Sequence, residues 1–209
     1  MKSYRINVKA IIAIVVILSL IIFSLFLISF RVAETESIGE MLLHYGFIIA
    51  PITLLWALTE NYLWHTRLFQ SIRKSLNIPP DLRGRWEGTL ENADGSPSQK
   101  FVIEVKQSLT TLVVHSFSSI GYSEGLLCEI AASHNEEVFT LCYLWEGGIS
   151  ASIKDIHSDH FAGYTMLKLN ENAAPKTLRG SYFTNRTALQ TRGGIELKWI
   201  SKTLKSKLE

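Results

Sequence analysis

The chain has 209 residues, with 21 Lys or Arg against 19 Asp or Glu, so its formal net charge at pH 7 is +2. This charge is too small to indicate a nucleic-acid polymer as a partner, and we expect none. The sequence carries no phosphate-binding glycine loop, no nucleophile elbow, no zinc-protease motif and no paired Cys/His ligand spacing, so we expect no enzyme activity, no metal site and no resident cofactor.

The first third of the chain holds two long apolar runs. Ala10–Phe30 contains no charged residue, and a second run begins at Met41. At the rise of an α-helix, each run is long enough to cross the ~30 Å core of a bilayer. The first run is too long for a signal-peptide core and lacks a cleavage site after it. We therefore predict a two-helix transmembrane hairpin in residues 1–78, with spans at about 8–30 and 41–64.

Charges beside these runs set the expected orientation. Basic residues flank the hairpin: Lys2, Arg5 and Lys9 before the first span, and Arg67, Arg73 and Lys74 after the second. The connection between the spans carries one arginine and three glutamates. Because basic flanks stay in the cytoplasm, we expect both termini and the remaining domain to be cytoplasmic.

The sequence pattern typical of a helix ends at Pro79-Pro80, because proline disfavours helix at and before its own position. Residues 79–209 are expected to form one β-rich domain. Short alternating apolar runs predict eight strands: Trp86–Leu90, Phe101–Gln107, Thr111–Ser118, Gly121–Ile130, Val138–Trp145, Phe161–Leu169, Leu178–Asn185 and Ile195–Ile200. Most connections are hairpin-sized, which favours antiparallel neighbours. We predict an all-β, eight-stranded, antiparallel up-and-down barrel of the lipocalin-like kind, with a β-sandwich as the alternative. Such a barrel can hold one small ligand.

Two features of the middle strands have competing interpretations. Cys128 and Cys142 are equidistant from Asn135, so a hairpin centred there would place them face to face, as small wall residues rather than as a redox pair. Residues 155–160 hold two histidines and two aspartates, and we favour a solvated loop over a metal site.

Strand parity selects candidate ligand-binding residues. Alternation places Tyr182, Thr184 and Arg186 on one face, and a guanidinium inside a barrel requires an anionic partner such as phosphate, unless Arg186 lies at the rim in water. The face of Tyr143 and Trp145 is undetermined, and either ring could stack on a base. Gly193-Gly194 either exposes backbone amides to a ligand or forms a turn. The candidate set is Tyr182, Thr184, Arg186, Trp86, Tyr143, Gln107 and Gly194.

Two short motifs carry a family resemblance. LxGxWxG covers Leu82–Gly88 and LxGxYxTxR covers Leu178–Arg186, and both follow the predicted two-span hairpin. This pattern resembles the two-transmembrane, β-strand-rich effectors of bacterial CBASS anti-phage systems.

The resemblance implies a function. A cognate nucleotidyltransferase would make a cyclic oligonucleotide, expected to be a cyclic dinucleotide, as the activating ligand of the barrel. Binding would drive homo-oligomerisation and disruption of the inner-membrane lipid, causing abortive infection. Residue patterns alone leave two alternatives open: a membrane-anchored, lipocalin-like carrier of an apolar ligand, and a structural membrane protein with a solid barrel.

Overall fold

The computed structural model describes residues 2–3, 8–29, 38–67, 69, 78–119, 121–132, 138–149, 160–185 and 191–208. The chain divides into two compact units. The first unit comprises Met1–Tyr4, Pro80–Gln107 and Thr111–Glu209, and the second comprises Arg5–Pro79 and Ser108–Thr110.

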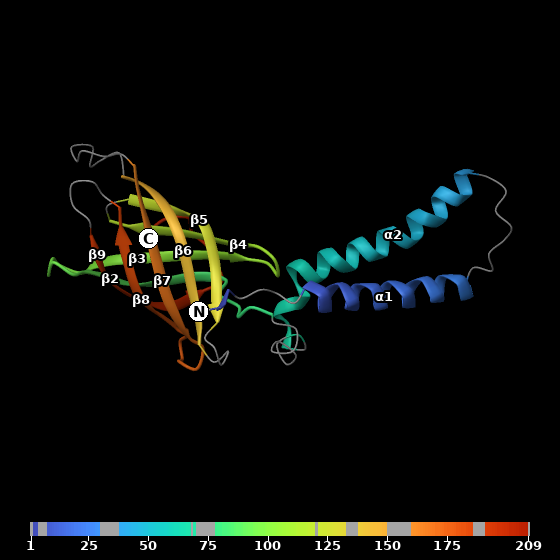
Figure 1. Cartoon of the computed structure of the whole chain (residues 1–209), viewed down its shortest axis with the longest axis horizontal. Helices are drawn as coiled ribbons and strands as arrows, with labels where there is room; N and C mark the ends of the chain where they lie inside the picture. The colour runs from blue at the N-terminus through green and yellow to red at the C-terminus, as the bar shows by residue number, and fades with distance from the viewer. Residues whose placement is uncertain are drawn as a thin grey trace. The chain divides into compact units, whose positions relative to one another are not determined.

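The first unit is a closed antiparallel barrel (Figure 1). Its strands are β2 (Gly84–Asn92), β3 (Gln99–Gln107), β4 (Leu112–Ser118), β5 (Gly121–Ala132), β6 (Phe139–Ile149), β7 (His160–Asn170), β8 (Thr177–Thr184) and β9 (Arg192–Ser201). Each strand pairs with its neighbour in sequence, and β2 pairs with β9 to close the sheet. The predicted eight-stranded up-and-down barrel is confirmed, and the sandwich alternative is wrong. A short strand, β1 (Lys2–Ser3), pairs with β5 and was not predicted.

Alternating side chains fill one end of the barrel with apolar groups. Trp86, Leu141, Leu167, Leu178 and Leu197 are all fully buried in a single cluster. In β2, Trp86 faces the core, whereas Arg85 and Glu87 form an ion pair with each other at 2.6 Å. This end of the barrel is therefore a packed core in the part of the chain that the structure describes.

Register corrects the expected cysteine pair. Cys128 lies opposite Tyr143, and Cys142 lies opposite Glu129. The hairpin pairs Ala132 with Phe139, so its centre falls half a residue beyond Asn135, and a one-residue slip in register moves a side chain to the other face. Cys128 therefore packs against the core cluster inside the barrel, and the prediction that the two cysteines face each other is wrong.

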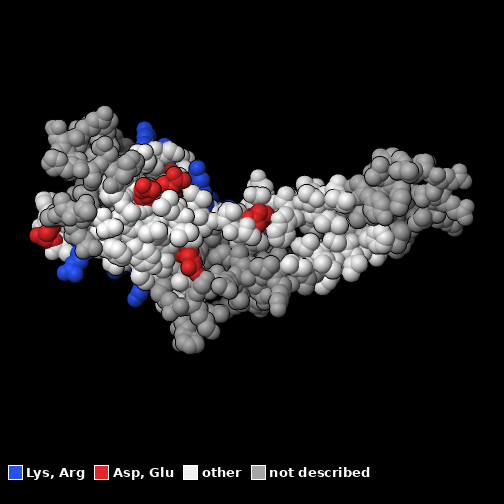
Figure 2. Space-filling view, turned by 45° about the horizontal axis from the view of Figure 1, so that its top comes forward, with Lys and Arg blue, Asp and Glu red and all other residues white. Residues whose placement is uncertain are grey.

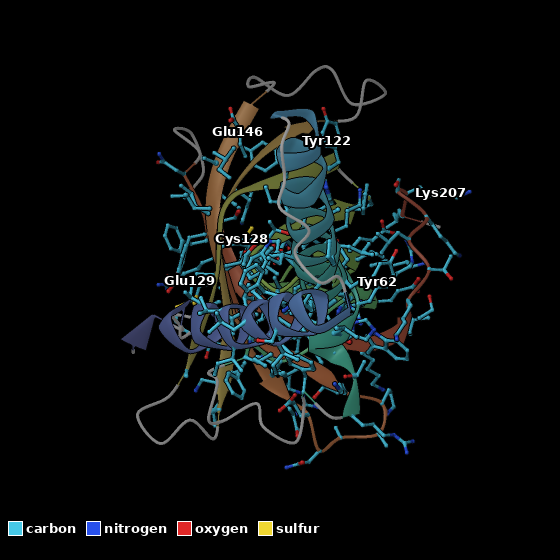
Figure 3. All side chains as sticks on the ribbon, turned by 90° about the vertical axis from the view of Figure 1, so that its right-hand side faces the viewer. Tyr62, Tyr122, Cys128, Glu129, Glu146 and Lys207 are labelled. Carbon is cyan, nitrogen blue, oxygen red and sulfur yellow. The ribbon has the colours of Figure 1, made fainter. Side chains whose placement is uncertain are left out.

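The C-terminal residues cover a buried ion pair on the outer wall of the barrel. Arg85 and Glu104 are 1% and 2% exposed and lie opposite each other on β2 and β3, with Nη1 and Oε1 2.8 Å apart. Glu104 accepts hydrogen bonds from the backbone N–H groups of Lys205 and Ser206, and Arg85 donates to the carbonyl of Lys207. Figure 3 shows this segment, with Lys207 labelled, on the side of the barrel away from Cys128 and Glu129.

The second unit contains α1 (Val8–Ser29), α2 (Ile38–Asn61) and a 3-10 turn, η1 (Leu63–His65). The two helices lie side by side as a hairpin (Figure 1). The described part of the face seen in Figure 2 is almost free of charge on these helices, and Ile17, Leu20 and Leu54 are each more than half exposed. The hydroxyl of Ser19 donates to the carbonyl of Val15 at 2.6 Å, which satisfies a polar group within this apolar sequence.

Helices are present where the sequence predicted membrane spans. Among the described residues, neither helix meets the length and hydropathy expected of a segment that crosses a bilayer. The two spans at about 8–30 and 41–64 and the cytoplasmic orientation stay predictions from sequence.

The end of α2 packs against three residues that follow β3 in the sequence and belong to the second unit. Leu109 is buried together with Trp64 and Ile78. The Glu60 carboxylate accepts hydrogen bonds from the hydroxyls of Ser108 and Thr110, the latter at 2.7 Å. The backbone N–H of Leu109 also donates to the carbonyl of Glu60 at 3.0 Å, so apolar packing and hydrogen bonding hold the same three residues.

Candidate ligand pocket in the barrel

A cavity opens at the end of the barrel opposite the aliphatic cluster. It encloses about 750 Å³, including the part open to solvent. Six of its lining residues carry aromatic rings, and most of the others carry hydroxyl or amide groups. The lining residues are Leu90, Asn92, Gln99, Phe101, Ser116, Ser118, Gly121, Tyr122, Ser123, Tyr143, Trp145, Phe161, Thr165, Tyr182, Thr184, Thr191 and Ile195.

Trp145 is the largest ring in the pocket, and its position is fixed from two sides. Its indole N–H donates to the Thr165 hydroxyl at 2.9 Å, and its ring meets Phe161 edge-on with the ring centroids 5.6 Å apart. Gly163 lies opposite Trp145 on β7, and a Cβ at Gly163 would fall 2.3 Å from the indole. The ring therefore occupies space that only a glycine at position 163 leaves open.

Tyr143 forms part of the floor of the pocket. Its hydroxyl lies 3.3 Å from the Ser116 hydroxyl, across the barrel interior. Burial raises the pKa of Tyr143 to about 12, although hydrogen bonds with Ser116 and Thr165 partly offset this rise. The phenol is thus neutral at physiological pH and presents an O–H group to the cavity.

Two side-chain pairs organise the polar rim. The Tyr182 hydroxyl donates to Oδ1 of Asn92, which joins β8 to β2. The hydroxyls of Thr184 and Thr191 lie 2.8 Å apart, and the backbone N–H of Thr191 donates to Thr184 Oγ1 at 3.0 Å. These contacts hold the four residues in place before any ligand arrives, which lowers the entropic cost of binding.

None of the described residues that line the cavity carries a charge. In the described part of the chain, no group of His, Cys, Asp and Glu is arranged to hold a metal ion. The pocket therefore offers aromatic faces, neutral hydroxyl and amide groups and a short aliphatic floor. This chemistry suits a ligand with planar, hydrogen-bonding rings, because stacking and neutral hydrogen bonds can act together.

The candidate residues fall into three groups. Tyr182, Thr184 and Tyr143 line the cavity. Three others lie elsewhere: Trp86 is in the aliphatic core and donates to the Leu82 carbonyl, Gln107 hydrogen-bonds the backbone of Leu82 and Pro80, and Gly194 is not among the lining residues. Arg186 lies outside the described residues, as does residue range 155–159 of the proposed solvated loop.

Several lining residues were missed by reasoning from the sequence. Trp145 had no assigned face, and Asn92, Ser116 and Thr165 were not considered. The alternation of side chains along a strand could have identified them, because residues two positions apart face the same side of the sheet. Asn92 is two positions from the inward-facing Leu90, and Thr165 is two positions from the inward-facing Leu167.

Comparison with known proteins places this pocket in context. The family model described as Cap15, cyclic dinucleotide receptor domain, matches residues 77–199, which is more than half of the chain. The matched segment contains β2–β8 and most of β9. A search of curated proteins finds no match. The resemblance to CBASS effectors is therefore confirmed, and the chain belongs to the family of Cap15 cyclic dinucleotide receptor domains.

Proposed function

We propose that the barrel pocket binds a cyclic dinucleotide and that the chain acts as a membrane-disrupting effector of an anti-phage system. The observation that carries this proposal is the pocket lining, in which Trp145, Tyr182 and Phe161 surround a cavity bordered by hydroxyl groups. The family match supports the ligand class.

The aromatic residues would hold the bases. A base stacked on an aromatic side chain gains about 1–3 kcal/mol, and stacking tolerates different bases because each has a π-face. The Trp145 ring is preset by Thr165 and Phe161, so little further ordering is needed. Gln99 lines the same cavity, and its amide could hydrogen-bond a base edge and contribute to base selectivity.

The hydroxyl groups would accommodate the sugar-phosphate ring. Ser116, Ser123 and Thr184 present O–H donors to the cavity, and such donors bind phosphate oxygens without bringing a charge into the barrel. A cation would strengthen this interaction. From the sequence, Arg186 is our candidate for that role, two positions beyond Thr184 in the same alternating series.

The helical unit would carry the effect to the membrane. Ile17, Leu20 and Leu54 are more than half exposed, and an apolar surface of this kind indicates contact with lipid or with another protein. We propose that both termini face the cytoplasm at the bacterial inner membrane, and that ligand-bound copies form a homo-oligomer whose helices disrupt the bilayer. The cell would then die before the phage matures.

Dye release from liposomes tests the membrane part of this proposal. The full chain is reconstituted into vesicles of bacterial polar lipid loaded with a self-quenching dye, and a cyclic dinucleotide or its linear counterpart is added. We expect release with the cyclic compound at low micromolar concentration and none with the linear one. Equal release with and without ligand, or no release although the ligand binds, would contradict the membrane-disrupting role.

A carrier of an apolar ligand is the second candidate, because the described lining residues carry no charge. That function predicts that lipid co-purifies with the chain and that cyclic dinucleotides do not displace it. Native mass spectrometry of the purified chain separates the two, since the carrier would retain a lipid mass that persists after addition of the nucleotide.

A further inference from the structure

The barrel wall has an incomplete junction between β4 and β5. β5 is 12 residues long, but it pairs with β4 only through Tyr122–Glu124, opposite His115–Phe117. A bulge between Gly125 and Leu127 then shifts the register of β5. On its other edge, β5 remains paired with β6 as far as Ala132. β5 therefore pairs with β6 along its full length and with β4 over only three of its 12 residues.

Beyond this bulge, two strand edges face each other without a ladder in the described part of the barrel. Gly125–Ile130 on β5 and Leu112–Val114 on β4 form what we call the β4–β5 seam. Leu126 and Leu127 at the bulge are 56% and 70% exposed. Strand edges with free backbone groups and exposed apolar side chains are sites where another strand adds.

A side chain already substitutes for part of the missing ladder. Cys128 lies in the seam, and its thiol hydrogen-bonds the backbone of Val114. A Cβ at Gly125 would fall 2.4 Å from the Cys128 sulfur and 3.3 Å from the Val114 carbonyl oxygen. In the seam, a side chain on the inner face therefore connects β5 to β4 where the backbone ladder is missing.

The far end of the seam shows which kind of strand fits there. β1 pairs antiparallel with the end of β5, with Lys2 opposite Ala132 and Ser3 opposite Ala131. Ala132 and Ala131 also pair with Phe139 and Thr140 of β6, so β1 occupies the edge of β5 that β4 has left. The N-terminal strand of this chain is therefore an occupant of the edge on which the seam lies.

We propose, building on the proposed function, that the edge of β5 at Ala131–Ala132, which continues into the β4–β5 seam, is a docking site for the N-terminal strand of a second copy of the chain, and that the bound ligand promotes this exchange. Exchange of an identical element between copies forms the same backbone bonds as the closed monomer, so it has a low energetic cost. Because the strand of one copy docks on the barrel of the next, the contact is head-to-tail and can extend into a larger oligomer.

The pocket is connected to this seam by the part that is paired. Ser116 and Ser123 lie opposite each other in the β4–β5 ladder, and both line the cavity. A ligand that hydrogen-bonds both hydroxyls would therefore contact the three-residue ladder that pairs β4 with β5. The ligand therefore changes the spacing of the seam, and with it the access of an incoming strand.

Disulfide cross-linking between separately labelled copies tests the exchange. Both native cysteines are replaced (Cys128→Ser and Cys142→Ser), and Ser3→Cys and Ala131→Cys are introduced into different full-length chains. The two chains are purified in detergent, mixed, treated with a cyclic dinucleotide and oxidised. Ser3 and Ala131 are direct partners across an antiparallel pair, which brings two cysteines within disulfide reach. We expect a ligand-dependent, cross-linked heterodimer, at least fivefold more abundant than without the nucleotide.

Two controls make the result decisive. Ser3→Cys mixed with Asn172→Cys, an exposed residue in the β7–β8 turn, measures random collision. A chain carrying both Ser3→Cys and Ala131→Cys shows that the pair can oxidise within one copy. Internal cross-linking of the double variant shows that the two cysteines can react, and a higher melting temperature of the mixture shows that the ligand binds. If both are observed and the heterodimer is still no more abundant than in the collision control, the exchange proposal is wrong, whereas ligand binding is supported. If the ligand raises no melting temperature in any chain, the proposed function itself fails.

Discussion

The indole N–H of Trp145 donates to the hydroxyl of Thr165 at 2.9 Å, which joins β6 to β7 inside the barrel. The two residues are not opposite each other in the ladder, because Thr165 pairs with Tyr143 and Trp145 pairs with Gly163. The indole therefore leans over the glycine to reach the hydroxyl. One hydrogen bond thus orients the largest aromatic surface of the pocket.

Replacing Trp145 should weaken the binding of a cyclic dinucleotide. Trp145→Ala removes a stacking surface worth about 1–3 kcal/mol, which corresponds to roughly a 5- to 150-fold rise in Kd. Trp145→Phe keeps a ring but loses the bond to Thr165, so its effect should be smaller. Trp199→Phe is the matched control, because Trp199 lies outside the cavity and donates to the Arg83 carbonyl. Equal affinity of Trp145→Ala and wild type in titration calorimetry would rule out a stacking role.

Glycines beside the pocket should differ sharply in their tolerance of a methyl group. A Cβ at Gly163 would meet the Trp145 ring at 2.3 Å, and one at Gly193 would meet the Glu91 carbonyl at 1.8 Å and the Tyr182 ring at 2.9 Å. A Cβ at Gly194 would meet nothing closer than 3.9 Å. Gly163→Ala and Gly193→Ala should therefore lower both the melting temperature and the ligand affinity.

Gly194→Ala should leave both properties unchanged and serves as the control. A clear loss of affinity in Gly194→Ala, with the melting temperature preserved, would instead support the sequence-based expectation that its backbone approaches the ligand.

Stability at high pH should depend on Tyr143. Its pKa is raised to about 12 in the folded chain, against about 10 in the unfolded chain, so its contribution is complete below pH 10 and is lost as the pH rises toward 12. The loss amounts to about 3 kcal/mol. Urea unfolding at pH 9 and pH 11.5 should show a smaller fall in the free energy of unfolding for Tyr143→Phe than for wild type. Parallel falls in the two proteins would show that the phenol is not held neutral by burial.

Breaking the buried ion pair should destabilise the barrel far more than breaking an exposed one. Arg85→Ala leaves the carboxylate of Glu104 buried and should cost about 3 kcal/mol of unfolding free energy. Arg179→Ala is the matched control, because the Arg179 and Glu196 side chains are 67% and 45% exposed and such pairs contribute at most about 1 kcal/mol. Similar losses in the two variants would mean that the C-terminal segment does not shield Glu104 from water.

The same pair predicts a loss of stability in acid. Burial alone would raise the pKa of Glu104, but hydrogen bonds from the Lys205 backbone, the Arg85 side chain and the Ser206 backbone outweigh it and hold the pKa below the usual value for glutamate. Because the folded-state pKa is lowered, this stabilisation is present at pH 7 and disappears as the pH falls through and below that usual value. Glu104→Gln should reduce the dependence of the melting temperature on pH between about 3 and 5.

The barrel could be predicted from the sequence because its strands alternate clearly and its connections are short. Phe101, Ile103 and Val105 mark an inward face in β3, and the equivalent pattern in β8 correctly places Tyr182 and Thr184 on the inner wall. Parity depends only on residue spacing, so it survives small errors in the strand ends.

Other features depend on register, which spacing alone does not determine. The bulge at Gly125/Leu127 and the hairpin centre beyond Asn135 decide which cysteine faces inward, and neither leaves a clear mark in the sequence. Gln107 and Gly194 were selected by polarity or flexibility. In the structure Gln107 hydrogen-bonds the backbone of Pro80 and Leu82, and Gly194 is not among the described residues that line the cavity. The contact between Glu104 and the C-terminal segment spans 101 residues of sequence and has no local signature.

Titration calorimetry of the full chain in detergent is the most direct test of the central proposal, that the pocket is a cyclic dinucleotide site. The probes are cyclic di-GMP, cyclic di-AMP, cyclic GMP-AMP and cyclic di-UMP, each compared with its linear dinucleotide. We predict one-to-one binding of at least one cyclic compound with a Kd in the micromolar range or below, at least tenfold weaker binding of its linear form, and loss of binding in Trp145→Ala. A folded chain that binds none of the cyclic compounds, or a Trp145→Ala chain that binds as tightly as wild type, would contradict it.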